Sequence, residues 1–394
     1  LESKNRLAEQ YQVQRALIEG FPKNEKAAEA SYDLAWLSYK TSDYRHAAEL
    51  FAEHLATFRT PQTKWVGEAA FWGGRAWERL GNVPRALFFY SLAAERYPFG
   101  YHGQIATRRT ELLKQRDPNV RPEQPAAGSQ LAKARENALA VQPIVETADE
   151  RATPRLVRVT DFQTIALWDV AMSELAAAQA LFPTSPRVAL AAANLFQARG
   201  DNYQATLALR KGYPDVYSYS EDQMPREAWE VMFPLSNWDA IKHQAALNNL
   251  DPYVVCGLIR QESVFNPKAL SRANARGLMQ LLPSTGKLVA KSQGLGAISP
   301  ADLYNPTLNI TLGTSYLSTQ LSKFGRIELA AAAYNAGPGR VVQWQAARPV
   351  EPIEEWVENI PLSETRGYVQ GVLRYAANYR RFYGKGEQRA GDAK

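Results

Sequence analysis

The chain has 394 residues, which exceeds the size of a single hydrophobic core and predicts two or more domains or an extended array. Hydrophobic residues make up 45% and charged residues 22% of the chain, and Gly (24) and Pro (23) are at average usage, which excludes collagen-like and largely disordered proteins. No apolar run approaches the roughly 18 residues of a membrane span, so we expect a water-soluble protein without an integral membrane span.

The net charge of +6 is unevenly distributed. The part before Pro225 carries 27 Lys and Arg against 26 Asp and Glu, and the rest carries 19 against 14. A basic C-terminal part suits an anionic polymer, although a basic surface kept only for solubility fits equally well. The excess is small and no nucleic-acid-binding motif accompanies it, so we expect no nucleic acid partner.

Cysteine and histidine content argues against a metal or cofactor. The single cysteine, Cys256, lies in an apolar helical run, which is typical of a buried, inert thiol. The four histidines are scattered, with no spacing typical of metal ligands. We therefore expect no cofactor and no metal.

The first half of the chain has a helical composition with a degenerate internal repeat. Residues 42–51 and 81–90, about 39 positions apart, each combine a polar turn, a small residue and, four positions later, an aromatic. The small residues are Ala47 and Ala86, and a third copy of the turn begins at Gly200. The pattern resembles tetratricopeptide-like helical hairpins with an irregular, longer period, so it predicts an α-superhelix over residues 1–116 and 131–224.

Two breaks in the helical pattern suggest domain boundaries. Residues 117–130 contain three prolines and predict a linker. A second break near 213–226 predicts a C-terminal domain at 225–386, followed by a flexible tail at 387–394. The helical half could bind partners or act as a scaffold for the second domain, and we favour the scaffold.

A carboxylate stands out in the C-terminal part. A helix is predicted to begin at Asp251-Pro252, because an N-cap residue precedes a proline at the first helical position. Its apolar face also carries Glu262, near the C-terminal end. Burial there raises the pKa of a carboxyl and keeps a proton available to a general acid. The alternative is a glutamate neutralised by an arginine at position 260, 272 or 276.

Four ordered segments resemble the soluble lytic transglycosylase family, lysozyme-like enzymes that cut the glycan of peptidoglycan. They are Glu262-Ser263, Gly-Leu-Met-Gln at 277–280, Ala-Tyr-Asn-Ala-Gly at 333–337, and residues 360–369. The resemblance covers roughly 228–384 closely, and upstream of this it extends only to architecture. It implies an all-α fold, with a superhelix followed by a lysozyme-like, mostly helical catalytic domain.

The resemblance implies a role for each matching residue. Glu262 corresponds to the family's single catalytic acid and base. The substrate-binding residues that it implies are Ser263, Met279, Gln280, Tyr334, Asn335, Glu364 and Tyr368.

These binding roles differ. Ser263 and Gln280 match residues that orient the N-acetyl and carbonyl groups of the substrate, and Met279 matches a hydrophobic wall of the cleft. Tyr334 and Asn335 match a pair that hydrogen-bonds near the catalytic carboxyl.

In the fourth segment, Glu364 and Tyr368 match groove residues on the muramyl side. Leu362 stands where the family often has an aromatic residue, so this chain departs from the pattern there.

The implied reaction cleaves the β-1,4 bond between N-acetylmuramic acid and N-acetylglucosamine and forms a 1,6-anhydromuramyl product. The implied partners are peptidoglycan glycan strands and, through the superhelix, cell-wall synthesis or division proteins. We expect a periplasmic, exported protein whose signal peptide is absent from this sequence.

Two alternative functions remain open. A goose-type muramidase would share the fold and the glutamate but release hydrated ends. A non-catalytic, peptidoglycan-binding helical-repeat scaffold would bind cell walls without releasing soluble products.

Overall fold

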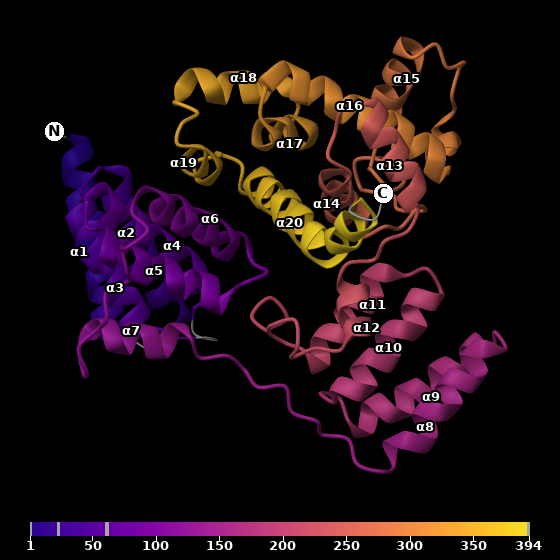
Figure 1. The fold of residues 1–394 in the computed structure, drawn as a ribbon, viewed down its shortest axis with the longest axis horizontal. Coiled ribbons are helices and arrows are strands. Elements are labelled where there is room, and N and C mark those ends of the chain that lie inside the picture. The colour runs from indigo at the N-terminus through magenta and orange to yellow at the C-terminus, as the bar shows by residue number, and fades with distance from the viewer. Residues whose placement is uncertain (1, 22–23, 60–62, 392–394) are drawn as a thin grey trace. The chain divides into compact units, whose positions relative to one another are not determined.

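The computed structural model describes residues 2–21, 24–59 and 63–391, and within these ranges helices joined by loops make up the chain (Figure 1). The described part contains no strand beyond isolated bridges that pair Arg276 with Leu270 and with Leu281. The predicted all-α fold is therefore confirmed. None of the described helices is both long and apolar enough to cross a membrane.

The chain forms two compact units. The first comprises residues 1–143 together with 215–223, and the second comprises 144–214 together with 224–394. The helices of the first unit are α1 (Glu2–Gly20), α2 (Glu25–Lys40), α3 (Tyr44–Thr57), α4 (Val66–Arg79), α5 (Val83–Arg96), α6 (Tyr101–Arg116) and α7 (Gln130–Ala138).

The second unit contains the remaining helices. They are α8 (Ala152–Thr164), α9 (Trp168–Leu181), α10 (Pro186–Ala198), α11 (Asn202–Gly212), α12 (Arg226–Met232), α13 (Trp238–Leu247), α14 (Pro252–Ser263), α15 (Pro283–Ser292), η1 (Pro300–Tyr304), α16 (Pro306–Phe324), α17 (Ile327–Ala336), α18 (Pro338–Ala347), α19 (Ile353–Glu358) and α20 (Ser363–Gly391).

The domain boundaries expected from composition at 117–130 and 225–386 stay predictions. The tail expected at 387–394 begins inside α20, which continues to Gly391, and residues 392–394 lie outside the described residues.

All three copies of the repeated turn start the second helix of a hairpin. The side chains of Asp43, Asn82 and Asp201 each accept a hydrogen bond from the backbone N–H three residues later, at the starts of α3, α5 and α11. These bonds satisfy N–H groups that a helix end otherwise leaves unpaired. The predicted hairpins are α2–α3, α4–α5 and α10–α11.

The small residues of the repeat allow close helix packing. Ala47 and Ala86 are completely buried, together with the aromatics Phe51 and Tyr90. On the preceding helix, a Cβ added at Gly74 would lie 2.6 Å from the Tyr90 ring, so only glycine fits there.

Residues 215–223 return to the first unit through a buried arginine. Arg96 is fully buried, forms an ion pair with Asp215 at 2.5 Å and donates a hydrogen bond to Ser218 Oγ. Tyr219 adds a hydrogen bond from its hydroxyl to the Gln142 carbonyl oxygen, at 2.9 Å. A buried charge requires such partners.

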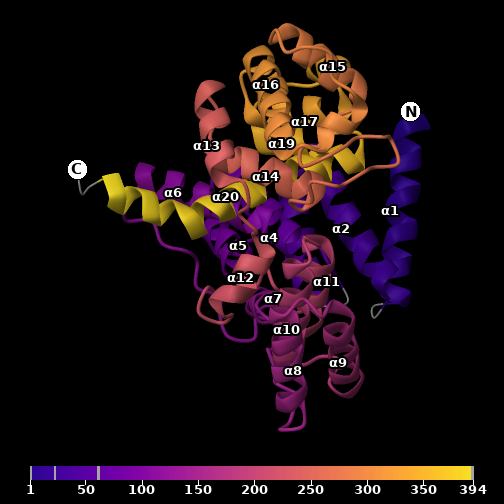
Figure 2. The same ribbon diagram turned by 90° about the vertical axis from the view of Figure 1, so that its right-hand side faces the viewer.

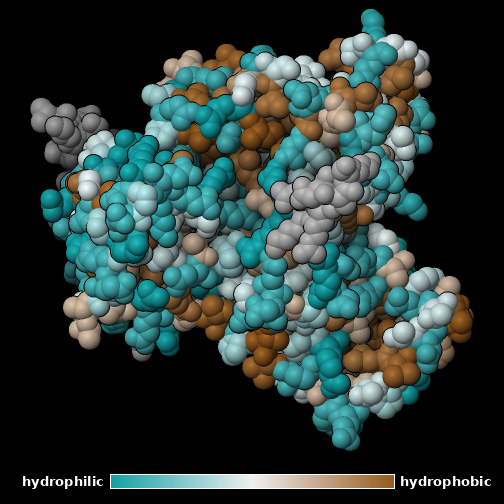
Figure 3. Space-filling model, in the orientation of Figure 1, coloured by the Kyte–Doolittle hydropathy of each residue, from teal (hydrophilic) through white to brown (hydrophobic). Residues whose placement is uncertain are grey.

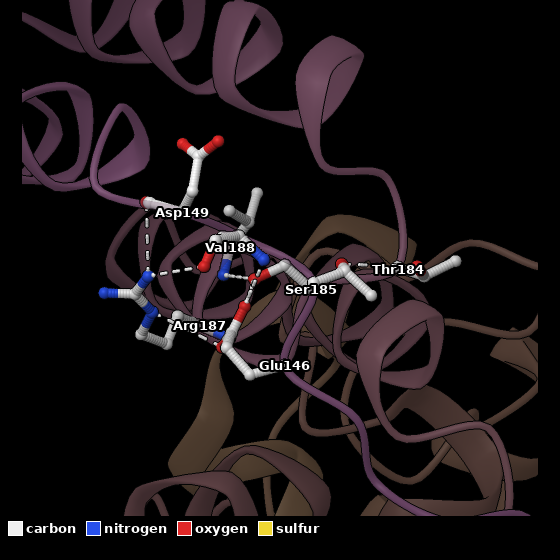
Figure 4. A network of polar contacts seen from close by, with 8 residues as sticks. Glu146, Asp149, Thr184, Ser185, Arg187 and Val188 are labelled. Carbon is white, nitrogen blue, oxygen red and sulfur yellow. Dashed lines mark hydrogen bonds and ion pairs between the residues drawn. The ribbon is translucent and has the colours of Figure 1, made fainter.

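In the second unit, a polar network attaches the segment before α8 to the start of α10 (Figure 4). Glu146 accepts hydrogen bonds from the Ser185 hydroxyl at 2.6 Å and from the Arg187 backbone at 3.3 Å. The Arg187 guanidinium donates to the Ala148 carbonyl at 3.1 Å. Burial raises the pKa of Glu146, but the hydrogen bonds from Ser185 and from the Ala148 and Arg187 backbones outweigh it, so this pKa lies below its ordinary value.

The surface is predominantly polar, with apolar side chains on the α8–α9 hairpin (Figure 3). Val157, Ile165, Leu167 and Val170 are all exposed there. Scattered exposed apolar residues are ordinary on a protein surface.

The core of the C-terminal part is the close crossing of α14 and α20, which lie side by side in both ribbon views (Figures 1 and 2). A Cβ at Gly257 of α14 would lie 2.6 Å from the Val372 carbonyl oxygen and 2.7 Å from the Ala376 nitrogen, both in the α20 backbone. At the same interface, a Cβ at Gly371 would meet only the end of the Gln261 side chain, at 2.1 Å.

Gly257→Ala is expected to lower the free energy of unfolding by about 2–3 kcal/mol, because a backbone obstacle forces the two helices apart. Gly371→Ala is the matched control and should stay within about 1 kcal/mol of wild type, because the Gln261 side chain can rotate away. Urea unfolding measures both. Equal stabilities of the two variants would contradict the crossing described here.

Candidate active site

Glu262 lies in the last turn of α14, where the local sequence determines both ends of the helix. The Asp251 carboxylate accepts from the Tyr253 N–H at 2.8 Å, and Pro252 occupies the first turn, as predicted. The helix stops at Ser263 because Val264 adopts a left-handed conformation, with φ of 52°. A carboxylate at a helix C-terminus meets the unfavourable end of the helix dipole, which favours its neutral form.

The surroundings of Glu262 favour its protonated form. Burial raises the pKa of Glu262 to about 7; a hydrogen bond from the Tyr368 hydroxyl opposes this rise, and the Glu364 carboxylate adds to it. The Tyr368 hydroxyl donates to Glu262 Oε1 at 2.7 Å, and Tyr368 as a whole is only 5% exposed. Glu262 therefore holds a proton close to neutral pH, which is the state that a general acid needs.

The arginine alternative is not supported. In the part of the chain that the structure describes, no arginine forms an ion pair with Glu262. Arg260 instead donates from Nε to the Met232 carbonyl at 2.9 Å and lies over the Tyr375 ring at 4.9 Å. Arg276 donates to the Asn274 side chain at 3.0 Å.

The turn at 277–280 is held by a buried asparagine of α16. Asn309 is fully buried, accepts from the Met279 N–H at 2.7 Å, and donates to the carbonyls of Arg276 at 3.0 Å and Leu303 at 2.8 Å. Gly277 has φ of 77°, and a Cβ there would lie 2.2 Å from the Leu303 oxygen. Only glycine allows this approach.

Met279 differs from the hydrophobic cleft wall that the resemblance implies. Its side chain is completely buried, against α16, where a Cβ at Gly313 would lie 2.4 Å from its sulfur. The prediction of a side-chain wall at Met279 therefore does not match its burial, because the 277–280 turn directs this side chain into the core. The Met279 carbonyl accepts from the Tyr334 hydroxyl at 2.8 Å, so its backbone joins the turn to α17.

Ser263 and Gln280 both make internal hydrogen bonds. The Ser263 hydroxyl lies 2.7 Å from the Leu278 carbonyl and so links α14 to the 277–280 turn. Gln280 donates from Nε2 to the carbonyls of Ala269 at 3.1 Å and Gly277 at 2.9 Å. These donations leave its amide oxygen as the acceptor available to a ligand.

The remaining predicted residues come from α17 and α20. Tyr334 is half-buried, and burial together with the nearby Glu262 carboxylate raises its pKa well above the ordinary value. Asn335 Oδ1 accepts from the Thr365 hydroxyl at 2.7 Å. Glu364 is exposed in the first turn of α20, four residues before Tyr368 and close enough to raise the pKa of Glu262.

Hydrogen bonds thus bring several of the predicted site residues together. Glu262 bonds to Tyr368, and Ser263 and Tyr334 bond to the 277–280 turn. Sequence reasoning did not identify Asn309, although an asparagine between Leu308 and Ile310 in a helix is a usable signal, since a buried amide must find partners.

No group of three His, Cys, Asp or Glu residues among those described is arranged to hold a metal ion. Cys256 is fully buried, and burial raises the pKa of its thiol. The predicted inert thiol is consistent with this burial.

Models of known protein families match the C-terminal region that contains these residues. A model described as the transglycosylase SLT domain matches residues 239–357, and one described as the soluble lytic transglycosylase helical domain matches residues 359–388. The four segments that suggested this family lie within these two matched ranges. The resemblance expected from the four segments is therefore confirmed.

Two curated relatives each match part of the chain. The soluble lytic murein transglycosylase of Escherichia coli strain K12 is 38% identical over 200 residues, covering 49% of this chain and 31% of the relative. A putative soluble lytic murein transglycosylase of Haemophilus influenzae is 45% identical over 159 residues, covering 39% of this chain and 27% of the relative. Each match spans about a third or less of the relative's length.

Solved structures resemble nearly the whole chain. An inactive Glu-to-Gln mutant of the lytic transglycosylase Slt from Pseudomonas aeruginosa matches with a TM-score of 0.66 and 25% identity, over 95% of this chain and 55% of that one. The 70-kDa soluble lytic transglycosylase in complex with bulgecin A matches with a TM-score of 0.61 and 26% identity, over 91% and 52%. This SLT-containing chain thus spans about half of each.

Proposed function

We propose that this protein is a peptidoglycan lytic transglycosylase in which Glu262 is the only acid and base. The proposal rests chiefly on one observation, the half-buried Glu262 whose pKa is raised to about 7 within an SLT domain. The basic surplus of the C-terminal part suits a glycan whose peptides carry free carboxylates, since opposite charge speeds encounter.

In the first step, protonated Glu262 donates its proton to the oxygen of the β-1,4 bond between N-acetylmuramic acid and N-acetylglucosamine. The C1–O bond breaks, the N-acetylglucosamine side leaves as an alcohol, and positive charge develops at C1. The 2-acetamido group of the muramyl residue stabilises this charge, as in substrate-assisted hydrolases. The Tyr368 hydroxyl stabilises the carboxylate that remains on Glu262.

In the second step, the Glu262 carboxylate takes the proton from the C6 hydroxyl of the same sugar. The C6 oxygen bonds to C1, which gives the 1,6-anhydro product and returns Glu262 to its protonated state. An intramolecular hydroxyl competes with water because its effective concentration is very high. In this scheme Gln280, Ser263 and Asn335 orient the substrate, and Glu364 contacts the muramyl side.

The products distinguish this reaction from a hydrolytic one. Mass spectrometry of muropeptides released from purified sacculi should find 1,6-anhydro ends. Hydrated reducing ends would instead assign the goose-type muramidase reaction. Binding to sacculi without soluble products would assign a non-catalytic scaffold.

Tyr368→Phe is expected to move the alkaline limb of the pH–rate profile to higher pH. The wild-type limb should lie near pH 7, because activity requires protonated Glu262. Removing the hydroxyl removes a hydrogen bond that favours the carboxylate, so the pKa of Glu262 rises further. Initial rates of muropeptide release across pH measure the shift.

Tyr379→Phe is the matched control for this variant. It removes a buried hydrogen bond on the same helix, from the Tyr379 hydroxyl to the Pro234 carbonyl at 2.8 Å, and should leave the limb unchanged. A limb that stays in place or moves to lower pH in Tyr368→Phe would contradict the role of this bond.

The substrate implies where the protein works. Peptidoglycan lies outside the cytoplasmic membrane, so we propose an exported, periplasmic protein. We further propose that the helical hairpins serve as a scaffold for the SLT domain. Cell-wall synthesis or division proteins are the candidate partners of these hairpins.

A further inference from the structure

Thr365 contacts a predicted site residue from a position that none of the motif roles covers. It lies in the first turn of α20, is 2% exposed, and its Oγ1 is 2.7 Å from Asn335 Oδ1. A buried hydroxyl proton without an acceptor is costly. Among the described residues, Asn335 Oδ1 is the only hydrogen-bond partner of the Thr365 hydroxyl, so the hydroxyl donates and the amide oxygen accepts.

This bond decides which end of the Asn335 amide is available. With Oδ1 occupied by Thr365, the free end is the Nδ2 group, which has two N–H donors and makes no hydrogen bond within the described part of the chain. Asn335 is only partly buried, in the last turn of α17, so a ligand can reach its side chain.

The same face of α20 also carries Tyr368, the hydrogen-bond partner of the candidate acid. Thr365 and Tyr368 are three residues apart and so lie on one side of the helix, about one turn from each other. Thr365 bonds to Asn335, and Tyr368 bonds to Glu262. The free amide donor and the acid are therefore fixed by adjacent turns of a single helix.

We propose that Thr365 is a positioning residue that orients Asn335 as a hydrogen-bond donor next to Glu262. The site then selects a ligand with an acceptor oxygen at that place, such as a carbonyl or a hydroxyl, and disfavours an ammonium group. This inference rests on the proposed function, because it takes the ligand to be a peptidoglycan glycan.

The experiment measures binding of soluble peptidoglycan fragments by calorimetry to Glu262→Gln, which should not cleave them. Adding Thr365→Val should raise the dissociation constant about five- to tenfold, the effect of one hydrogen bond. Adding Thr365→Ser keeps the hydroxyl and should change the constant by less than about twofold. Adding Asn335→Asp keeps an acceptor for Thr365 but removes the donor, so it should weaken binding at least as much as Thr365→Val.

If Thr365 only stabilised the fold, the titration would give a different result. Misfolding would lower the fraction of protein that binds, seen in the titration stoichiometry and in thermal unfolding, without changing the dissociation constant of the folded molecules. An unchanged constant in Thr365→Val or in Asn335→Asp overturns the inference. If Thr365→Val does not fold, Asn335→Asp decides alone.

Failure of the proposed function is recognised separately. In that case the wild-type protein releases no muropeptides and Glu262→Gln binds no fragments, and the inference falls with it. If release and parent binding are both present while the added variants have no effect, only the inference about Thr365 is overturned.

Discussion

Replacing Glu262 with glutamine is expected to lower muropeptide release by about a thousandfold or more, because the side chain can then neither donate nor accept the proton. Glutamine has nearly the same size and can still accept the hydrogen bond from the Tyr368 hydroxyl, so the fold should be retained. Release from sacculi, followed by chromatography, measures the loss.

Glu230→Gln is the matched control, because its exposed carboxylate only pairs with Arg226 on the same helix. Such surface pairs contribute little, so its activity should stay within about twofold of wild type. Retained activity in Glu262→Gln would remove Glu262 from its role.

The same variant should also change the pH dependence of stability. Glu262 keeps its proton up to about pH 7 in the folded protein, against an ordinary value of 4.5 in the unfolded chain. Wild type therefore loses stability as pH rises from about 4.5 to about 7. Glu262→Gln lacks this loss, so it should be the more stable protein at pH 8, and the difference should shrink below pH 5.

Asn309→Leu is expected to lower the free energy of unfolding by about 3 kcal/mol or more, because the Met279 N–H and the Arg276 and Leu303 carbonyls lose their buried partner. The 277–280 turn also loses its attachment to α16. Muropeptide release below the unfolding temperature should therefore fall as well, since Tyr334 and Ser263 bond to this turn.

Asn305→Ala offers a control four residues earlier. Asn305 caps α16 from an exposed position, by accepting from the Leu308 N–H at 3.1 Å, and its loss should cost about 1 kcal/mol. Urea unfolding compares the two. If Asn309→Leu were no less stable than Asn305→Ala, Asn309 would not be what holds the turn.

The sequence predicted those features that depend on local chemistry. The hairpins followed from a repeated polar turn, and the structure shows that its residues Asp43 and Asn82 each cap a helix by accepting from an N–H three positions later. The placement of Glu262 followed from helical periodicity after an Asp-Pro start. These signals are contained within one helix, so they can be read without the rest of the fold.

Features that depend on partners distant in sequence were not predicted. The bond between Tyr368 and Glu262 joins residues 106 positions apart, and the bond between Asn309 and Met279 joins residues 30 apart. Burial of the Met279 side chain likewise depends on the approach of Gly313 from another helix. The family resemblance identified Met279 as a site residue, but only packing determines which way its side chain points.

Glu262 can act as the acid only if a large fraction of its carboxyl groups still hold a proton at neutral pH. Carbon-13 NMR of protein labelled at the glutamate side-chain carboxyl measures this directly, with the Glu262 signal assigned by its absence in Glu262→Gln. The structure predicts that this signal titrates with a pKa of about 7. Titration near 4.5, the ordinary value for a glutamate, would mean a carboxylate that is already charged at neutral pH and would contradict the role of Glu262 as the acid.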